Sequence, residues 1–98
     1  MTEIADFNME DDAQRRRYFK TMPDGGEAEL TLVKTSPTQW IATHTFVPPA
    51  NRGGDLAAKL VDRLVADARQ EGVKIRATCW YVAGAFKRHA DEWEDVRA

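Results

Sequence analysis

The chain has 98 residues, which is enough for one domain with a single modest core and too few for two. Hydrophobic residues make up 43% and charged residues 31%, as in ordinary globular proteins, and no apolar stretch approaches the length that crosses a bilayer. The net charge of −2 gives no general attraction to nucleic acid or to an anionic membrane, so neither is expected as a partner.

Cysteine content and the N-terminus indicate where the protein resides. Cys79 is the only cysteine, so an internal disulfide is impossible and no metal site is expected. The first residues lack the basic and apolar runs of a secretory signal. These features predict a cytoplasmic protein.

The first 14 residues are acidic, with five Asp or Glu side chains and no Lys or Arg. This composition predicts a flexible N-terminal arm over residues 1–14, followed by one domain over residues 15–98. The basic triplet at 15–17 indicates the outer face of an edge strand, and a phosphate contact is the alternative.

Three short strands are predicted next. Residues 17–22 lead into the turn Pro-Asp-Gly-Gly at 23–26, and residues 27–34 alternate between apolar and polar side chains, as a half-buried strand does. The third strand, residues 39–47, places alternate residues on one face: Trp40, Ala42, His44 and Phe46. The short connections predict an antiparallel meander.

The second half of the chain changes period after Pro48-Pro49, which ends the third strand. Apolar residues at helical spacing predict a helix over residues 56–69 with Gly72 at its C-cap. A fourth strand over 73–79 and a shorter helix over 81–89 follow, with a helical turn or tail at 91–96. A strand, a helix and a strand in this order imply a parallel crossover. The predicted fold is therefore α+β: a mixed, mostly antiparallel sheet of four to five strands with two to three helices.

The loop ahead of the long helix, residues 51–55, combines the features of an anion site. A helix N-terminus presents free N–H groups and a partial positive charge. Gly53 and Gly54 let the backbone approach a ligand closely, and Arg52 adds a charge suited to phosphate. The simpler alternative is a turn in which Asp55 caps the helix.

Two separated segments resemble the minimal, stand-alone (YjdJ-type) branch of the GCN5-related N-acetyltransferase superfamily. Residues 43–61 (THTFVPPANRGGDLAAKLV) resemble its His-Thr-x-Val-Pro-Pro strand end and the glycine-rich loop that opens a helix. Residues 79–82 (CWYV), with Arg88-His89, resemble its Cys-x-Tyr-Val and Arg-His-Pro-Glu-Tyr segments. The resemblance covers residues 15–96. It implies the acyl-CoA N-acyltransferase fold, acetyl-CoA (coenzyme A) as cofactor, and transfer of the acetyl group to an amine.

The resemblance also implies where the cofactor binds. The pyrophosphate would lie on the loop and the helix start, the pantetheine arm along the end of the third strand, and the thioester in a gap between the third and fourth strands, where a backbone N–H polarises its carbonyl. The implied cofactor-binding residues are Phe46, Val47, Arg52, Gly53, Gly54, Asp55, Leu56, Ala57, Tyr81 and His89.

Cys79 and His44 are the expected catalytic residues. Cys79 would protonate the leaving thiolate or accept the acetyl group, and its alternative is a small buried apolar side chain. His44 would act as a base, orient Cys79, or play a structural role. For Tyr81 the alternative is packing, and for His89 it is capping of its own helix.

Two residues depart from the family pattern. Asp55 replaces a glycine and brings negative charge near the pyrophosphate, and Phe46 replaces a Glu that is a plausible general base. Three hypotheses follow: an acetyltransferase acting on an amine or a basic peptide, a coenzyme-A-binding module with weak catalysis, and a small protein-interaction domain. The acceptor is not identified by the sequence, and a monomer or weak dimer is expected.

Overall fold

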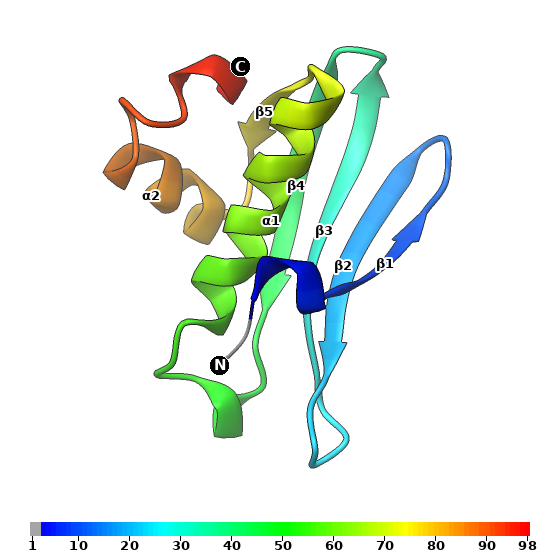
Figure 1. Cartoon of the computed structure of the whole chain (residues 1–98), viewed down its shortest axis with the longest axis vertical. Coiled ribbons are helices and arrows are strands. Elements are labelled where there is room, and N and C mark those ends of the chain that lie inside the picture. The colour runs from blue at the N-terminus through cyan, green and yellow to red at the C-terminus, as the bar shows by residue number, and fades with distance from the viewer. Residues whose placement is uncertain (1–2) are drawn as a thin grey trace.

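The computed structural model describes residues 3–98, which form a twisted five-stranded sheet with two helices on one face (Figure 1). The strands are β1 (Asn8–Asp11), β2 (Arg15–Thr21), β3 (Glu27–Ser36), β4 (Gln39–Phe46) and β5 (Lys74–Ala77). They lie in chain order; β1 to β4 are antiparallel and β5 is parallel to β4. The helices are α1 (Leu56–Glu71) and α2 (Trp80–Arg88), and short 3-10 turns span Ile4–Asp6, Pro49–Asn51 and Glu94–Val96. The predicted α+β architecture is confirmed.

The acidic N-terminal segment belongs to the sheet, which differs from the predicted flexible arm. Strand β1 pairs with β2, and Phe7 just before it is buried in the core. The pairing sets Glu10 opposite Arg17 and Asp11 opposite Arg16. Opposite charges on facing strands stabilise each other, so the acidic segment and the basic triplet are partners. Composition alone suggested disorder because it considers each segment without its partner. Because β1 pairs with β2, β2 is an interior strand and not the predicted edge strand.

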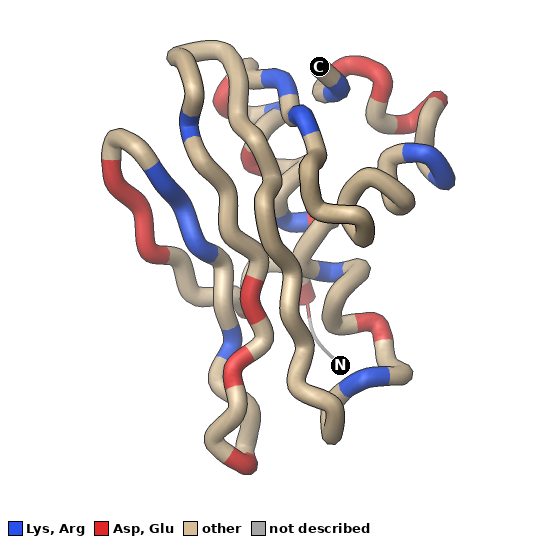
Figure 2. The backbone as a smooth tube through the Cα atoms, turned by 180° about the vertical axis from the view of Figure 1, so that it is seen from behind, with Lys and Arg blue, Asp and Glu red and all other residues tan. Residues whose placement is uncertain are grey.

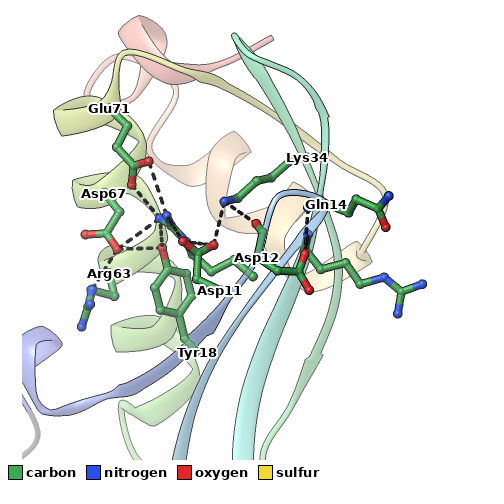
Figure 3. A network of polar contacts seen from close by, with 10 residues as sticks. Asp11, Asp12, Gln14, Tyr18, Lys34, Arg63, Asp67 and Glu71 are labelled. Atoms are coloured by element: carbon green, nitrogen blue, oxygen red, sulfur yellow. Dashed lines mark hydrogen bonds and ion pairs between the residues drawn. The ribbon is translucent and has the colours of Figure 1, made fainter.

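Arg16 is the centre of an ionic network that ties β2 to α1 (Figure 3). Its side chain is only 5% exposed, and its nitrogens lie 3.0 Å from Asp11 and 2.6 Å from Glu71. The hydroxyl of Tyr18 donates to Asp67 at 2.7 Å within the same network. A buried charge needs such partners, because an unpaired one is costly. The hydrogen bond from Arg16 lowers the pKa of Asp11 to about 2.

A β-bulge interrupts β4 at Thr43. The pairing with β3 passes from Leu32↔Ala42 directly to Thr31↔His44, so Thr43 is an extra residue with no counterpart. A bulge bends its strand and increases the local twist. It also interrupts the two-residue alternation of faces.

The bulge decides which side chains of β4 lie on the inner face, the sheet face that the helices cover, and which lie on the opposite, outer face. Beyond the bulge, Thr45 pairs with the buried Leu30 and therefore lies on the inner face. His44 and Phe46 lie on the outer face. The predicted common face of these two residues with Trp40 is wrong, because the extra residue shifts the alternation.

The helices cover the inner face and begin at the same end of the sheet. One stripe of α1 is buried: Leu56, Leu60, Val61, Leu64, Val65 and Ala68. The helix ends as predicted at Gly72, whose φ of 71° is left-handed. Because α1 follows β4 and α2 follows the parallel β5, both helix N-termini lie beyond the carboxyl ends of these two strands. No helix within residues 3–98 is long and apolar enough to cross a membrane.

Candidate functional site

Strands β4 and β5 separate at the end where both helices begin. Their pairing runs from Gln39↔Lys74 only to Ala42↔Ala77. The carbonyl of Ala42 then accepts hydrogen bonds from the N–H of Thr78 at 3.0 Å and of Cys79 at 3.2 Å, and the chain turns into α2. Within residues 3–98, the rest of β4 has no strand paired on its β5 side. The edge of β4 is therefore open beside the bulge.

A pocket of about 190 Å³ lies next to this open edge, at the N-terminus of α1. Its walls come from the end of β4, the following loop, the first turn of α1 and the start of α2. The lining residues are Val47, Asn51, Arg52, Gly53, Gly54, Leu56, Ala57 and Tyr81. All but Asn51 belong to the predicted cofactor-binding set, so the fold brings most of that set together.

Arg52 holds the loop onto the end of β4. Its Nε donates to the carbonyl oxygen of Val47 at 2.8 Å, and its guanidinium lies 5.7 Å from the centre of the Phe46 ring. The hydrogen bond uses Nε, so the terminal nitrogens remain as donors for an anion. Beside it, Oδ1 of Asn51 is buried without a hydrogen-bond partner, which costs about 1–3 kcal/mol. A ligand N–H would satisfy this oxygen.

The glycines of the loop leave space at the pocket. Gly53 has a φ of 94°, a conformation that favours glycine. A Cβ built at Gly54 would meet no atom within 4 Å, so packing within the protein does not require glycine there. Backbone that is open on the pocket side suits the close approach of an anion.

Asp55 stands at the N-cap of α1 but does not line the pocket. Its carboxylate makes no capping hydrogen bond, so the predicted capping role does not hold. The negative charge of the loop therefore lies outside the pocket lining, and the first N–H groups of α1 are not blocked by a side chain.

Cys79 lies at the opening between the two strands. It is buried at the N-cap of α2, and its Sγ lies 3.6 Å from Oγ1 of Thr45. This contact spans the point where β4 and β5 separate. The sequence analysis missed Thr45, because the bulge that turns it to the inner face is invisible in an alternating pattern.

His44 lies on the outer face and is not the partner of Cys79. Its Nε2 is 3.5 Å from Oε2 of Glu29, and the other carboxylate oxygen of Glu29 accepts a hydrogen bond from Nε of Arg17 at 2.6 Å. The alternative in which His44 orients Cys79 does not hold, because His44 lies on the outer face of β4, whereas Cys79, at the N-cap of α2, contacts Thr45 on the inner face. The role of a base remains a prediction, now with Glu29 as its neighbour.

Besides Asp55, two predicted cofactor-binding residues lie outside the pocket. His89 follows α2 at its C-cap position, stacks on Trp93 at a ring distance of 4.3 Å, and places Nδ1 3.0 Å from Glu92. This arrangement matches the alternative of a residue that ends its helix. Phe46 is 40% exposed and contacts Arg52 on the outer face.

A wider cavity of about 710 Å³ opens over the outer face and reaches the bulge. Its walls come from β1, β2, β3 and β4 and combine acidic, basic and neutral side chains. The lining residues are Glu10, Asp11, Asp12, Arg15, Arg16, Arg17, Thr31, Leu32, Val33 and Thr43.

Known proteins share this architecture. Residues 17–96 match the family model described as GCN5-related N-acetyl-transferase. The solution structure of a GCN5-like candidate N-acetyltransferase from Staphylococcus aureus superposes with a TM-score of 0.61 at 20% identity, over 100% of this chain and 91% of that one. The crystal structure of Tetrahymena GCN5 gives 0.62 at 9% identity, over 79% of this chain and 51% of that one.

At such identities the two structures establish the fold alone, and this chain spans about half the length of the Tetrahymena chain. A search among curated protein sequences gave no match. The family model, however, covers most of the sequence. The chain belongs to the GCN5-related N-acetyltransferase family.

Proposed function

We propose that this protein binds acetyl-CoA at the opening between β4 and β5 and transfers the acetyl group to an amine. The family provides the enzyme class, an N-acetyltransferase. The observation that carries the site assignment is the pocket that joins the N-terminus of α1, the Gly53-Gly54 backbone and the open edge of β4. The two motif segments support the narrower assignment to the minimal, stand-alone branch, and the single cysteine supports the cytoplasm.

The pocket suits the pyrophosphate of the cofactor. The free N–H groups and partial positive charge of the α1 N-terminus attract a phosphate, and the terminal nitrogens of Arg52 supply further donors. A volume of about 190 Å³ holds a diphosphate rather than the whole cofactor. The remainder would lie along the open edge of β4, where Oδ1 of Asn51 offers an acceptor to an amide N–H.

The two faces of β4 separate the proton-handling groups. Bound acetyl-CoA supplies a thioester as the acetyl donor. On the outer face, Nδ1 of His44 is placed to take the proton of the amine, because Glu29, held by Arg17, faces Nε2 and keeps the imidazole N–H on that side. On the inner face, the Cys79 thiol beside Thr45 is placed to give a proton at the opening. The pair of His44 and Glu29 would thus replace the base that the family pattern has at position 46.

The acceptor would approach over the outer face. The cavity there reaches Thr43, next to His44, and carries the acidic residues Glu10, Asp11 and Asp12. Arg15, Arg16 and Arg17 line the same cavity and balance these carboxylates, so the acceptor class, an amine or a basic peptide, rests on the family and not on the charge of this cavity.

An NMR titration with acetyl-CoA tests the cofactor site. The amide signals of Gly53, Gly54 and Cys79 should shift saturably, and the melting temperature should rise because the ligand binds only the folded chain. The variant Gly54→Val should abolish both effects, because it adds a β-branched side chain at a residue that lines the pocket. Ala58→Val, an exposed change in the first turn of α1 outside the pocket lining, is the matched control and should bind normally.

No shift of these three signals at millimolar acetyl-CoA would refute the proposal. Turnover is then measured with a panel of amines and basic peptides. Binding without turnover on any of them would refute catalysis and favour the cofactor-binding module instead.

A further inference from the structure

We propose that α2 carries a subsite for the adenine ring of the cofactor, formed by Gly84 between Trp80 and Arg88. The inference rests on the proposed function, because it extends the proposed acetyl-CoA site beyond the pocket at the N-terminus of α1. That pocket has a volume of about 190 Å³ and holds a diphosphate. Adenine is joined to the diphosphate through a single ribose, so the ring has to lie on the surface next to the pocket.

One stripe of α2 leads away from the pocket. Tyr81 lines the pocket, and Gly84 and Arg88 follow it three and seven residues later, which places them on the same side of the helix. The guanidinium of Arg88 lies 5.9 Å from the centre of the Tyr81 ring, so the stripe is continuous. Trp80, four residues before Gly84, borders the stripe at the start of the helix. Gly84 therefore leaves a gap between two large side chains.

The fold of the protein does not require a glycine at position 84. Gly84 lies inside a helix, where glycine is less stable than alanine. It does not adopt a positive φ, and a Cβ built on it would contact Nη1 of the flexible Arg88 side chain at 3.5 Å, an ordinary van der Waals distance. Neither the backbone conformation nor the packing explains this glycine. A planar ring that lies close to the helix backbone would explain it.

Trp80 provides the aromatic surface of the subsite. Its side chain is 82% exposed, whereas Trp40 and Trp93 are buried. The indole contacts the Tyr81 ring at a centroid distance of 5.8 Å and an interplanar angle of 83°. The indole thus stands beside a residue of the pocket wall and is largely open to solvent. An exposed indole contributes little to the core, but it offers a face on which a base can stack.

Among the described residues, two other large hydrophobic side chains are exposed, and both are less suitable: Met9 and Phe46. Met9 lies on β1, at the edge of the sheet opposite β5. The Phe46 ring lies on the outer face of β4 and already contacts the Arg52 guanidinium at 5.7 Å. The first two turns of α2, by contrast, carry no charged residue, and Figure 2 shows this helix as basic only at its end. An uncharged surface beside the pocket suits a neutral base.

Two ligands separate this subsite from the rest of the cofactor site. S-acetyl-4′-phosphopantetheine keeps the acetyl group, the pantetheine arm and one phosphate of acetyl-CoA but lacks the adenosine. Gly84→Gln should fill the gap, so calorimetry should show a Kd for acetyl-CoA that is about fivefold to tenfold higher and an unchanged Kd for the truncated ligand. The same substitution should raise the melting temperature of the free protein by a few degrees, because glutamine is a better helix former than glycine. Ala83→Gln is the matched control: Ala83 is exposed on α2 about 200° around the helix from Tyr81, and this variant should bind both ligands as the parent does.

Substitutions of Trp80 test the stacking directly. Because the side chain is exposed, its loss should not unfold the chain. Trp80→Ala should weaken acetyl-CoA binding about as much as Gly84→Gln does, and Trp80→Phe should keep most of the affinity, because a phenyl ring still stacks. In the complex with the parent chain, the ring protons of adenine should give nuclear Overhauser effects to the α-protons of Gly84.

The outcomes distinguish this subsite from the proposed cofactor site. An absence of acetyl-CoA-induced shifts at Gly53, Gly54 and Cys79 would refute both. Shifts at these residues, combined with a parental Kd for acetyl-CoA in Gly84→Gln and Trp80→Ala, would overturn the adenine subsite alone. An equal loss of affinity for both ligands in Gly84→Gln would also overturn it, because the glycine would then serve the pantetheine or phosphate part of the cofactor and not the ring.

Discussion

Replacing Asp11 by Asn tests the ionic network that attaches the N-terminal strands to α1. The hydrogen bond from Arg16 lowers the pKa of Asp11 from 3.8 to about 2. At about 1.4 kcal/mol per pKa unit this shift corresponds to roughly 2.5 kcal/mol, but the carboxylate is 32% exposed and solvent screens it, so about 1 kcal/mol is expected. Asp11→Asn should lower the free energy of unfolding at pH 7 by that amount.

The pH dependence gives the sharper test. Because the pKa of Asp11 is lower in the folded chain, its contribution is complete above pH 3.8 and is lost as the pH falls through about 2. Urea unfolding of parent and variant at pH 7 and at pH 2 measures the difference directly. Asp91→Asn, an exposed carboxylate on the C-terminal segment, is the control and should change little at either pH. A difference between parent and Asp11→Asn that is as large at pH 2 as at pH 7 would refute the reasoning.

Four other predictions concern the site and its supports. His44→Gln should lower kcat by about 100-fold, as the loss of a general base does, with an unchanged Kd for acetyl-CoA by calorimetry; an unchanged kcat would exclude the base. Arg52→Gln should raise that Kd by about tenfold, and a wild-type Kd would remove Arg52 from the phosphate site. Gly72→Ala should cost about 1 kcal/mol in urea unfolding, because only the φ of 71° opposes a side chain there. Deletion of Thr43 should keep the melting temperature within a few degrees but weaken acetyl-CoA binding, since a regular β4 would no longer bend away from β5; normal binding by this variant would show that the bulge does not form the site.

Most of the proposed cofactor pocket was predictable because its residues are close in sequence. Arg52 to Ala57 form one continuous loop and helix start, so the geometry of a helix N-terminus fixes their arrangement without knowledge of the rest of the fold. Tyr81 joins them because α2 starts at the same end of the sheet as α1, which follows from the parallel pairing of β4 and β5.

Features that depend on pairing were not predictable in the same way. The acidic residues of β1 suggest disorder until they face the basic residues of β2, and a single sequence does not state this register. The bulge is hidden for a similar reason: the run Thr43-His44-Thr45 looks the same with or without an extra residue, and only the pairing with Leu30 and Thr31 reveals it. The contact between Thr45 and Cys79 depends on it.

The bulge also gives the proposed donor and acceptor different faces of β4. Beyond the bulge, β4 presents Thr45 to the inner face, near the helix N-termini, and His44 to the outer face, near the wide cavity. On the β5 side, the strand is open beyond Ala42, just before the bulge. The extra residue thus stands next to the opening and between both chemical environments, so in the proposed reaction a donor held on the inner side and an amine arriving over the outer side would meet across the thickness of a single strand.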